Sequence, residues 1–316
     1  MVVVALDQRL ARPVFTVDDA PSAWADVIAA ARAWGTWDPV ERAAAAGLLG
    51  AGAQPPPDVT AIVEARATVV RRERRLLAAD DVVVWLQMWG ITTAQWFAHL
   101  RRQVLSEGAS ADPAGADRTA LAQAAWIEGV TGGELERTTL RLAERRAAWA
   151  SRAGTRPEPD HAALERAVAE LCDDAATPAR LAAVVERNRL GWTRLELREV
   201  VLADEGAAHE LVYCLRDDGR DLAEVACEAG LTVHSRATTV DELAPALARL
   251  TAARPGEVTD PVAIDGAHRV IVVDARVEPT VGDRATAARA RELIVRGALA
   301  GQVSRRVRWL DPAVRG

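Results

Sequence analysis

The chain has 316 residues and a formal net charge of −6, and half of its residues are apolar, which is enough to bury a sizeable core. An acidic chain lacks the excess of basic side chains on which nucleic-acid and anionic-membrane binding depend, so we expect neither partner. All 39 basic residues are arginine, which excludes chemistry that needs a lysine nucleophile or Schiff base.

The cysteines and the first residues indicate the compartment. Cys172, Cys214 and Cys227 are odd in number, form no Cys-x-x-Cys pair and lie in apolar helical patterns, which is typical of a reducing environment. The N-terminus lacks a basic n-region, and no apolar run reaches the roughly 18 residues of a membrane span. We therefore expect a cytoplasmic protein. Neither a metal-ligand spacing nor a glycine-rich phosphate loop is present, so we expect no metal and no cofactor.

The N-terminal part of the chain reads as a series of helices after a short strand-like start and Pro13. Capping residues such as Asp18 and Asp38, prolines in first turns and glycines past the last turns set the helix limits. The predicted helices are 18–34, 38–49, 58–77, 80–89, 92–105, 118–130, 134–151, 161–175 and 178–190.

The region from Trp192 to Arg276 mixes strands and helices and predicts one small α+β domain. Residues 193–277 hold nine Arg against sixteen Asp and Glu, so the acidity of the chain is concentrated there. The predicted strands are 195–202, 258–264 and 269–275, and the predicted helices are 205–216, 220–229 and 240–250.

Five segments of this region resemble the parvulin family of peptidyl-prolyl isomerases. They are Leu197–Leu202 followed by a helix, Asp221–Ala226, Glu242–Leu250, Pro255–Val262 and Arg269–Arg276. The Pro-Gly-Glu-Val turn at the start of the fourth segment, before a Pro-Val strand, is the most specific of them.

An earlier stretch, Leu76–Leu105, looks like the helix pair in the N-terminal domain of SurA-type foldases, the chaperones that carry parvulin modules. The residues that carry this similarity are Gly90-Ile91-Thr92, leading to Trp96 and Leu100-Arg101.

The two resemblances together imply a domain arrangement. The amphipathic helix predicted at 279–303 cannot bury its apolar face alone, and the SurA-like resemblance implies that it packs on the N-terminal helices. We expect a predominantly helical α+β protein, in which a helical chaperone-like domain carries an inserted parvulin-like α+β domain. The expected limits are 1–191 for the N-terminal helical domain, 192–277 for the parvulin-like domain and 278–316 for the C-terminal helix.

The family's catalytic positions are occupied by other residue types here. Active parvulins place one histidine on the first strand and one on the last, with a Cys or Asp between them and with Met and Phe lining the proline pocket. The first position falls on Glu199, and the last falls on Arg269, or on His268 if the strand slips by one residue. Residues 231–239 replace a longer glycine-rich segment. The positions expected to bind a peptide are Val240, Leu243, Leu247 and Trp192.

Two functions follow from the resemblance. The first is a cytoplasmic, peptide-binding, foldase-like chaperone or peptide-maturation factor whose degenerate parvulin-like domain is inactive. Its partner would be a peptide or an unfolded or precursor polypeptide, held between the acidic domain and the tryptophan-bearing helical domain. The second is a weak peptidyl-prolyl cis–trans isomerase, without a cofactor, that uses Glu199, His268 or Arg269 on a precursor peptide. The sequence does not predict the oligomeric state.

Overall fold

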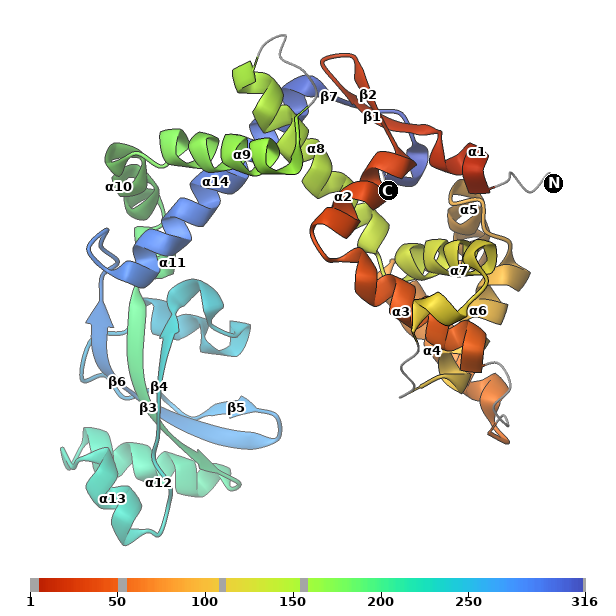
Figure 1. Ribbon diagram of the computed structural model, residues 1–316. Helices are drawn as coiled ribbons and strands as arrows, with labels where there is room; N and C mark the ends of the chain where they lie inside the picture. The colour runs from red at the N-terminus through yellow and green to blue at the C-terminus, as the bar shows by residue number, and fades with distance from the viewer. Residues whose placement is uncertain (1–5, 51–55, 108–111, 154–158, 315–316) are drawn as a thin grey trace. The chain divides into compact units, whose positions relative to one another are not determined.

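The computed structural model describes residues 6–50, 56–107, 112–153 and 159–314. The chain divides into two units, one formed by residues 1–171 and 297–316 and the other by residues 172–296. We call them the helical unit and the small unit. The predicted α+β class with a predominance of helix is confirmed (Figure 1), and in chain order the small unit is inserted between the two segments of the helical unit.

The expected domain limits differ from this division. Both expected limits, at 191/192 and at 277/278, fall inside the small unit. In this division the small unit also takes in residues 172–191 and 278–296, from which Val185 and Ala290 pack with Trp192. No helix among the described residues is both long and apolar enough to cross a membrane.

The core of the helical unit is built around tryptophans. The rings of Trp24, Trp89 and Trp126 contact one another with centroids 5.1 to 6.0 Å apart. The indole of Trp24 also donates a hydrogen bond to the buried carboxylate of Asp311, near the C-terminus of the chain. The helices of this unit are α1 (Leu6–Leu10), α2 (Trp24–Ala33), α3 (Trp37–Leu49), α4 (Val59–Glu73), α5 (Ala79–Met88), α6 (Thr93–Leu105), α7 (Arg118–Thr131), α8 (Glu134–Ala153) and most of α9 (His161–Ala175), with a 3-10 turn, η2 (Pro113–Gly115).

A small sheet replaces the start of the first predicted helix. Strands β1 (Pro13–Val17) and β2 (Ala20–Ala23) form a hairpin, and Asp18 and Asp19 are its two turn residues, with φ of 45° and 69°. The prediction that Asp18 opens a helix was wrong, because both turn residues have the positive φ of a type I′ hairpin turn, a conformation that Asp tolerates.

The C-terminal segment completes this sheet. Helix α14 (Arg284–Arg306) leads into β7 (Val307–Trp309), which pairs with β1 and gives the strand order β2-β1-β7. Val303, Val307 and Trp309 pack against the tryptophan-rich core, and a 3-10 turn, η5 (Pro312–Val314), follows. The last described residues of the chain are therefore part of the helical unit.

The small unit is a four-stranded antiparallel sheet with a different cover on each face. Helices α12 and α13 pack on one face, where their apolar residues meet Val200 and Val272, and η4 packs on the other, against Leu197 and Ile271. The strand order is β4-β3-β6-β5 (Figure 1). Its elements are α10 (Pro178–Arg187), α11 (Arg189–Trp192), β3 (Arg194–Leu202), α12 (Glu205–Arg216), α13 (Leu222–Glu228), β4 (His234–Thr239), η3 (Val240–Glu242), η4 (Pro245–Ala252), β5 (Val262–Ile264) and β6 (Ala267–Val277).

Two predictions in this unit were wrong in detail. The helix predicted at 240–250 is two 3-10 pieces, because Pro245 forces Ala244 into an extended conformation with ψ of 147°. The strand predicted at 258–264 is paired as a strand only at its end, in β5, and Val258 forms an isolated bridge.

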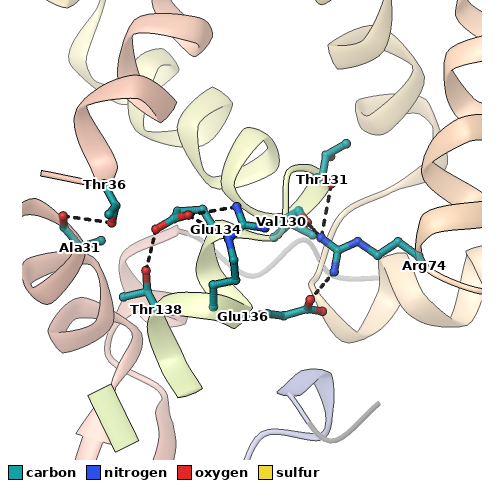
Figure 2. Close-up of polar contacts among 9 residues, drawn as sticks. Ala31, Thr36, Arg74, Val130, Thr131, Glu134, Glu136 and Thr138 are labelled. Atoms are coloured by element: carbon teal, nitrogen blue, oxygen red, sulfur yellow. Dashed lines mark hydrogen bonds and ion pairs between the residues drawn. The ribbon is translucent and has the colours of Figure 1, made fainter. Parts of the chain in front are cut away.

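Arg74, at the C-terminal end of α4, holds the turn between α7 and α8 (Figure 2). Its guanidinium donates to the carbonyl oxygens of Val130 and Thr131, at 3.0 and 3.4 Å, and forms an ion pair with Glu136. These carbonyls lie in the last turn of α7, where helices leave acceptors without partners. Gly133 follows at φ of +76°, and a Cβ there would come within 2.5 Å of the same guanidinium.

We predict that Arg74→Met lowers the free energy of unfolding of the helical unit by about 2 kcal/mol, because two carbonyls and a partly buried carboxylate lose their donor. Urea unfolding followed by tryptophan fluorescence reports on this unit, which holds nine of the ten tryptophans. The exposed neighbour Arg72 supplies the matched control, Arg72→Met, with an expected change below about 0.5 kcal/mol. Equal changes for the two variants would contradict the role given to Arg74.

Candidate functional site

A buried carboxylate lies between two arginines on one face of the small unit's sheet. Glu199, on the central strand β3, is 6% exposed. Its Oε1 accepts a hydrogen bond of 3.1 Å from Nη1 of Arg269 on β6, and its Oε2 lies 3.6 Å from Nε of Arg236 on β4. We call these three residues the Glu199 cluster. It joins three neighbouring strands.

The pairing of the strands explains why these side chains meet. Glu199 lies opposite Ile271 of β6 and His234 of β4, so Arg269 and Arg236, each two residues further along its strand, project from the same face. Leu195 and Leu197 occupy this face earlier on β3 and are completely covered, whereas Val201, beyond Glu199, is 39% exposed. The cluster therefore lies where the covered core gives way to solvent.

The cluster has more donors than its single carboxylate can accept. Nε and Nη2 of Arg236 and Nε of Arg269 are buried without a hydrogen-bond partner. Oε2 of Glu199 also lacks a hydrogen bond, since 3.6 Å is too long for one, although the charges still attract each other. The carboxylate thus interacts with two guanidiniums, and several N–H groups of these guanidiniums have no hydrogen-bond acceptor.

The three predicted catalytic positions do not all come together. Arg269 contacts Glu199, whereas His268 lies opposite Leu202, whose side chain belongs to the core on the α12 face. Because neighbouring strand residues point to opposite faces, His268 and Glu199 are on different sides of the sheet. The register places Arg269, not His268, beside Glu199. Among the described histidines, it is the exposed His234 that shares the face of Glu199.

The predicted peptide-binding leucines belong to the core of the small unit. Leu247 on η4 is 3% exposed and packs in the cluster that contains Leu195, Leu197 and Ile271. Leu243 and Val240 are partly buried against the same cluster. Leu247 therefore presents almost no surface to a ligand.

Trp192 is also covered, by neighbours from the two flanking helices. It is 5% exposed, packs with Val185 and Ala290, and has the guanidinium of Arg289 over its ring at 4.8 Å.

The guanidinium of Arg289 also donates a hydrogen bond of 2.6 Å to the carboxylate of Asp241. Partial burial would raise the pKa of Asp241, but hydrogen bonds from the Thr239 hydroxyl and Arg289 outweigh it and lower that pKa below its ordinary value.

The outer edge of β4 carries unpaired backbone groups. The N–H of Val240 donates to the carbonyl of Thr193 at 3.0 Å, so these two residues form a hydrogen-bonded pair of the ladder. Hydrogen-bonded and non-hydrogen-bonded pairs alternate along an antiparallel ladder. The N–H groups of Ser235 and Ala237, which belong to non-hydrogen-bonded pairs, therefore point away from β3. Among the described residues, no strand pairs with this side of β4. Such an edge can accept an extended peptide as an additional strand. Arg236 lies between Ser235 and Ala237, the two residues whose N–H groups point outward.

Sequence reasoning missed Arg236, because residues 231–239 were expected to be a shortened connection. The alternation of His234, Arg236 and Thr238 with smaller residues was the available signal for a strand. Among the described residues, no group of three or more His, Cys, Asp or Glu side chains is arranged to hold a metal ion.

Comparison with known proteins gives structural similarities only. No family model and no curated protein matches the chain. The foldase protein PrsA of Lactococcus lactis is 11% identical, with 96% of each chain covered and a TM-score of 0.27. The peptidylprolyl isomerase PrsA of Bacillus anthracis is 12% identical over 54% of this chain and 87% of its own, with a TM-score of 0.25.

A further structure comes from work on two SurA-like chaperones of Campylobacter jejuni. It is 7% identical, with 94% of this chain and 98% of that chain covered and a TM-score of 0.20. The similar structures are thus foldases and chaperones by name, at identities and TM-scores too low to assign this chain their fold or their function.

We predict that Leu247→Ala lowers the free energy of unfolding of the small unit by about 3 kcal/mol, because it leaves a cavity in a covered cluster. Leu190→Ala is the control, since this side chain of the same unit is 74% exposed and its loss should cost less than about 0.5 kcal/mol. Amide NMR signals of the small unit, followed through urea unfolding, give both values. An unchanged stability in Leu247→Ala would refute the core assignment.

A second prediction concerns Asp241, whose folded-state pKa is lowered from the ordinary value of 3.8. Its contribution to stability is fully present above that value and is lost as the pH falls through the lower folded-state pKa. Asp241→Asn should therefore reduce the melting temperature near neutral pH and have a vanishing effect at about pH 2. The exposed Asp218 gives the control Asp218→Asn, with little effect at either pH. A constant effect of Asp241→Asn at both pH values would contradict the ion pair.

Proposed function

We propose that the protein is a cytoplasmic, peptide-binding, foldase-like chaperone or peptide-maturation factor, and that its small unit binds a peptide without catalysing prolyl isomerisation. The observation that carries the proposal is the Glu199 cluster beside the open edge of β4. The odd number of cysteines supports the compartment, and the parvulin-like motifs support the class of client.

Binding follows from the backbone of β4. An extended peptide that pairs with Ser235 and Ala237 gains main-chain hydrogen bonds whatever its sequence, as a chaperone for varied clients requires. Its alternate side chains would then lie on the face that carries Arg236.

The ion pairing of Glu199 supports the proposal that the unit does not catalyse isomerisation. Rotation about a prolyl bond meets a barrier of about 18–20 kcal/mol, which falls only if the site favours the twisted bond over the planar one. Oε1 of Glu199 is bound by Arg269, and Arg236 faces Oε2, so the carboxylate is not free to act on an imide. His268, the other candidate, lies on the opposite face.

The alternative is a weakly active peptidyl-prolyl cis–trans isomerase acting on a precursor peptide. The exposed His234, opposite Glu199 in register, is the observation that favours it, because it places an imidazole on the same face. The following experiment separates the two functions.

NMR exchange spectroscopy on a short Ala-Pro peptide series, with and without the full chain, reports binding and the cis–trans rate together. We expect shifted or broadened peptide signals with the uncatalysed rate retained. Faster exchange at substoichiometric protein would show that the unit is an isomerase and would overturn the proposal.

Two variants of the exposed Ala237 test the edge of β4. Ala237→Pro removes an outward N–H, while the ladder with β3 keeps its donors, so we expect peptide binding to weaken at least about tenfold. Ala237→Val keeps the N–H and is the matched control, with binding unchanged. Unchanged binding in Ala237→Pro, in a protein shown to be folded by circular dichroism, would exclude this edge as the binding surface.

A further inference from the structure

The Glu199 cluster contains two guanidiniums and one carboxylate, and therefore carries one uncompensated positive charge. Three nitrogens of these guanidiniums are buried without a partner. These three nitrogens are not accessible to a ligand, but the side chains of Arg236 and Arg269 are 36% and 27% exposed as a whole, so other atoms of both side chains face solvent. A guanidinium that is partly open to solvent and carries uncompensated charge can form charge-assisted hydrogen bonds with a carboxylate.

The surroundings restrict which carboxylate can be bound. Residues 193–277 hold sixteen acidic side chains against nine arginines, so an acidic peptide is repelled at long range. A peptide with neutral or basic side chains and one carboxylate avoids this repulsion and still meets the two guanidiniums at short range. The free C-terminus of a peptide fits this description.

We propose that the Glu199 cluster is a carboxylate-binding subsite that captures one carboxylate of the bound peptide through Arg236 and Arg269. This inference rests on the proposed peptide-binding function and deepens it. Glu199 acts as an internal competitor, because its carboxylate takes one donor, Nη1 of Arg269, and its charge attracts both guanidiniums. The subsite therefore selects a peptide end or an acidic residue next to the edge of β4.

If Glu199 competes with the ligand, replacing Glu199 and replacing an arginine change the affinity for a carboxylate in opposite directions, which a purely structural cluster would not predict. Glu199→Gln removes the competing charge and leaves both guanidiniums in need of an anion, so the affinity for a carboxylate should rise. Arg236→Gln removes one of the two binding cations, so that affinity should fall.

The probes are three peptides: acetyl-Leu-Ala-Pro-Ala as the free acid, the same peptide as its C-terminal amide, and acetyl-Leu-Asp-Pro-Ala amide. Each is titrated by calorimetry into the full-length wild-type protein, Arg236→Gln, Glu199→Gln and the control Arg249→Gln. Arg249 lies in the same unit, exposed, with its ion pair to Asp260 instead of the cluster.

We expect wild type to bind the acid about tenfold more tightly than the amide, the range of one charge-assisted contact. Arg236→Gln should abolish this preference, Arg249→Gln should retain it, and Glu199→Gln should enlarge it. If Glu199→Gln does not fold, the comparison of Arg236→Gln with Arg249→Gln still tests whether the cluster binds the carboxylate.

The third peptide identifies the source of the carboxylate. Tighter binding of the acid than of the Asp-containing amide assigns the subsite to the C-terminus, and equal binding of both assigns it to carboxylates of either source.

Two other results would overturn the inference, and only the second would also refute the proposed peptide-binding function. Equal binding of the acid and the plain amide to wild type would refute the subsite and leave peptide binding intact. Binding of none of the three peptides would refute both the subsite and the proposed function.

Discussion

The ion pairing of Glu199 is the constraint on which this account of the small unit depends. A carboxylate that is 6% exposed must be neutralised by partners, and here the partners come from the two strands on either side of β3. The same contacts therefore join β4, β3 and β6 across one face. They also offset the charge of Glu199 with two guanidiniums.

The position of the cluster links stability to recognition. It lies where the apolar cover of η4 ends. Arg236 lies on the edge strand β4, whose N–H groups at Ser235 and Ala237 point away from β3. In the proposed function, a peptide paired with that edge would lie next to Arg236. In this chain the register turns His268 to the other face.

Local signals in the sequence predicted most helices and the two central strands. Thr92 and Gln95, for example, form a reciprocal cap where a helix start was expected. Elements that depend on long-range pairing were missed, as with β7, which is a strand only because β1 lies beside it. The alignment of motifs pointed to Glu199 and left the second position open between Arg269 and His268; the register of β6 brings Arg269 to Glu199, and Arg236 emerges only from the register of β4. Likewise, the resemblance gave Leu247 as a peptide-binding position, and only the structure shows that its side chain lies in the core of the small unit.

The most direct test of the cluster is the NMR signal of its arginine side chains. We expect resolved, slowly exchanging Nε–H resonances for Arg236 and Arg269, because both Nε atoms are buried, and we expect Glu199→Gln to shift both. The exposed Arg249 is the internal reference for fast exchange with solvent. Nε–H groups of Arg236 and Arg269 that exchange as fast as that of Arg249, and do not respond to Glu199→Gln, would contradict the cluster and the function drawn from it.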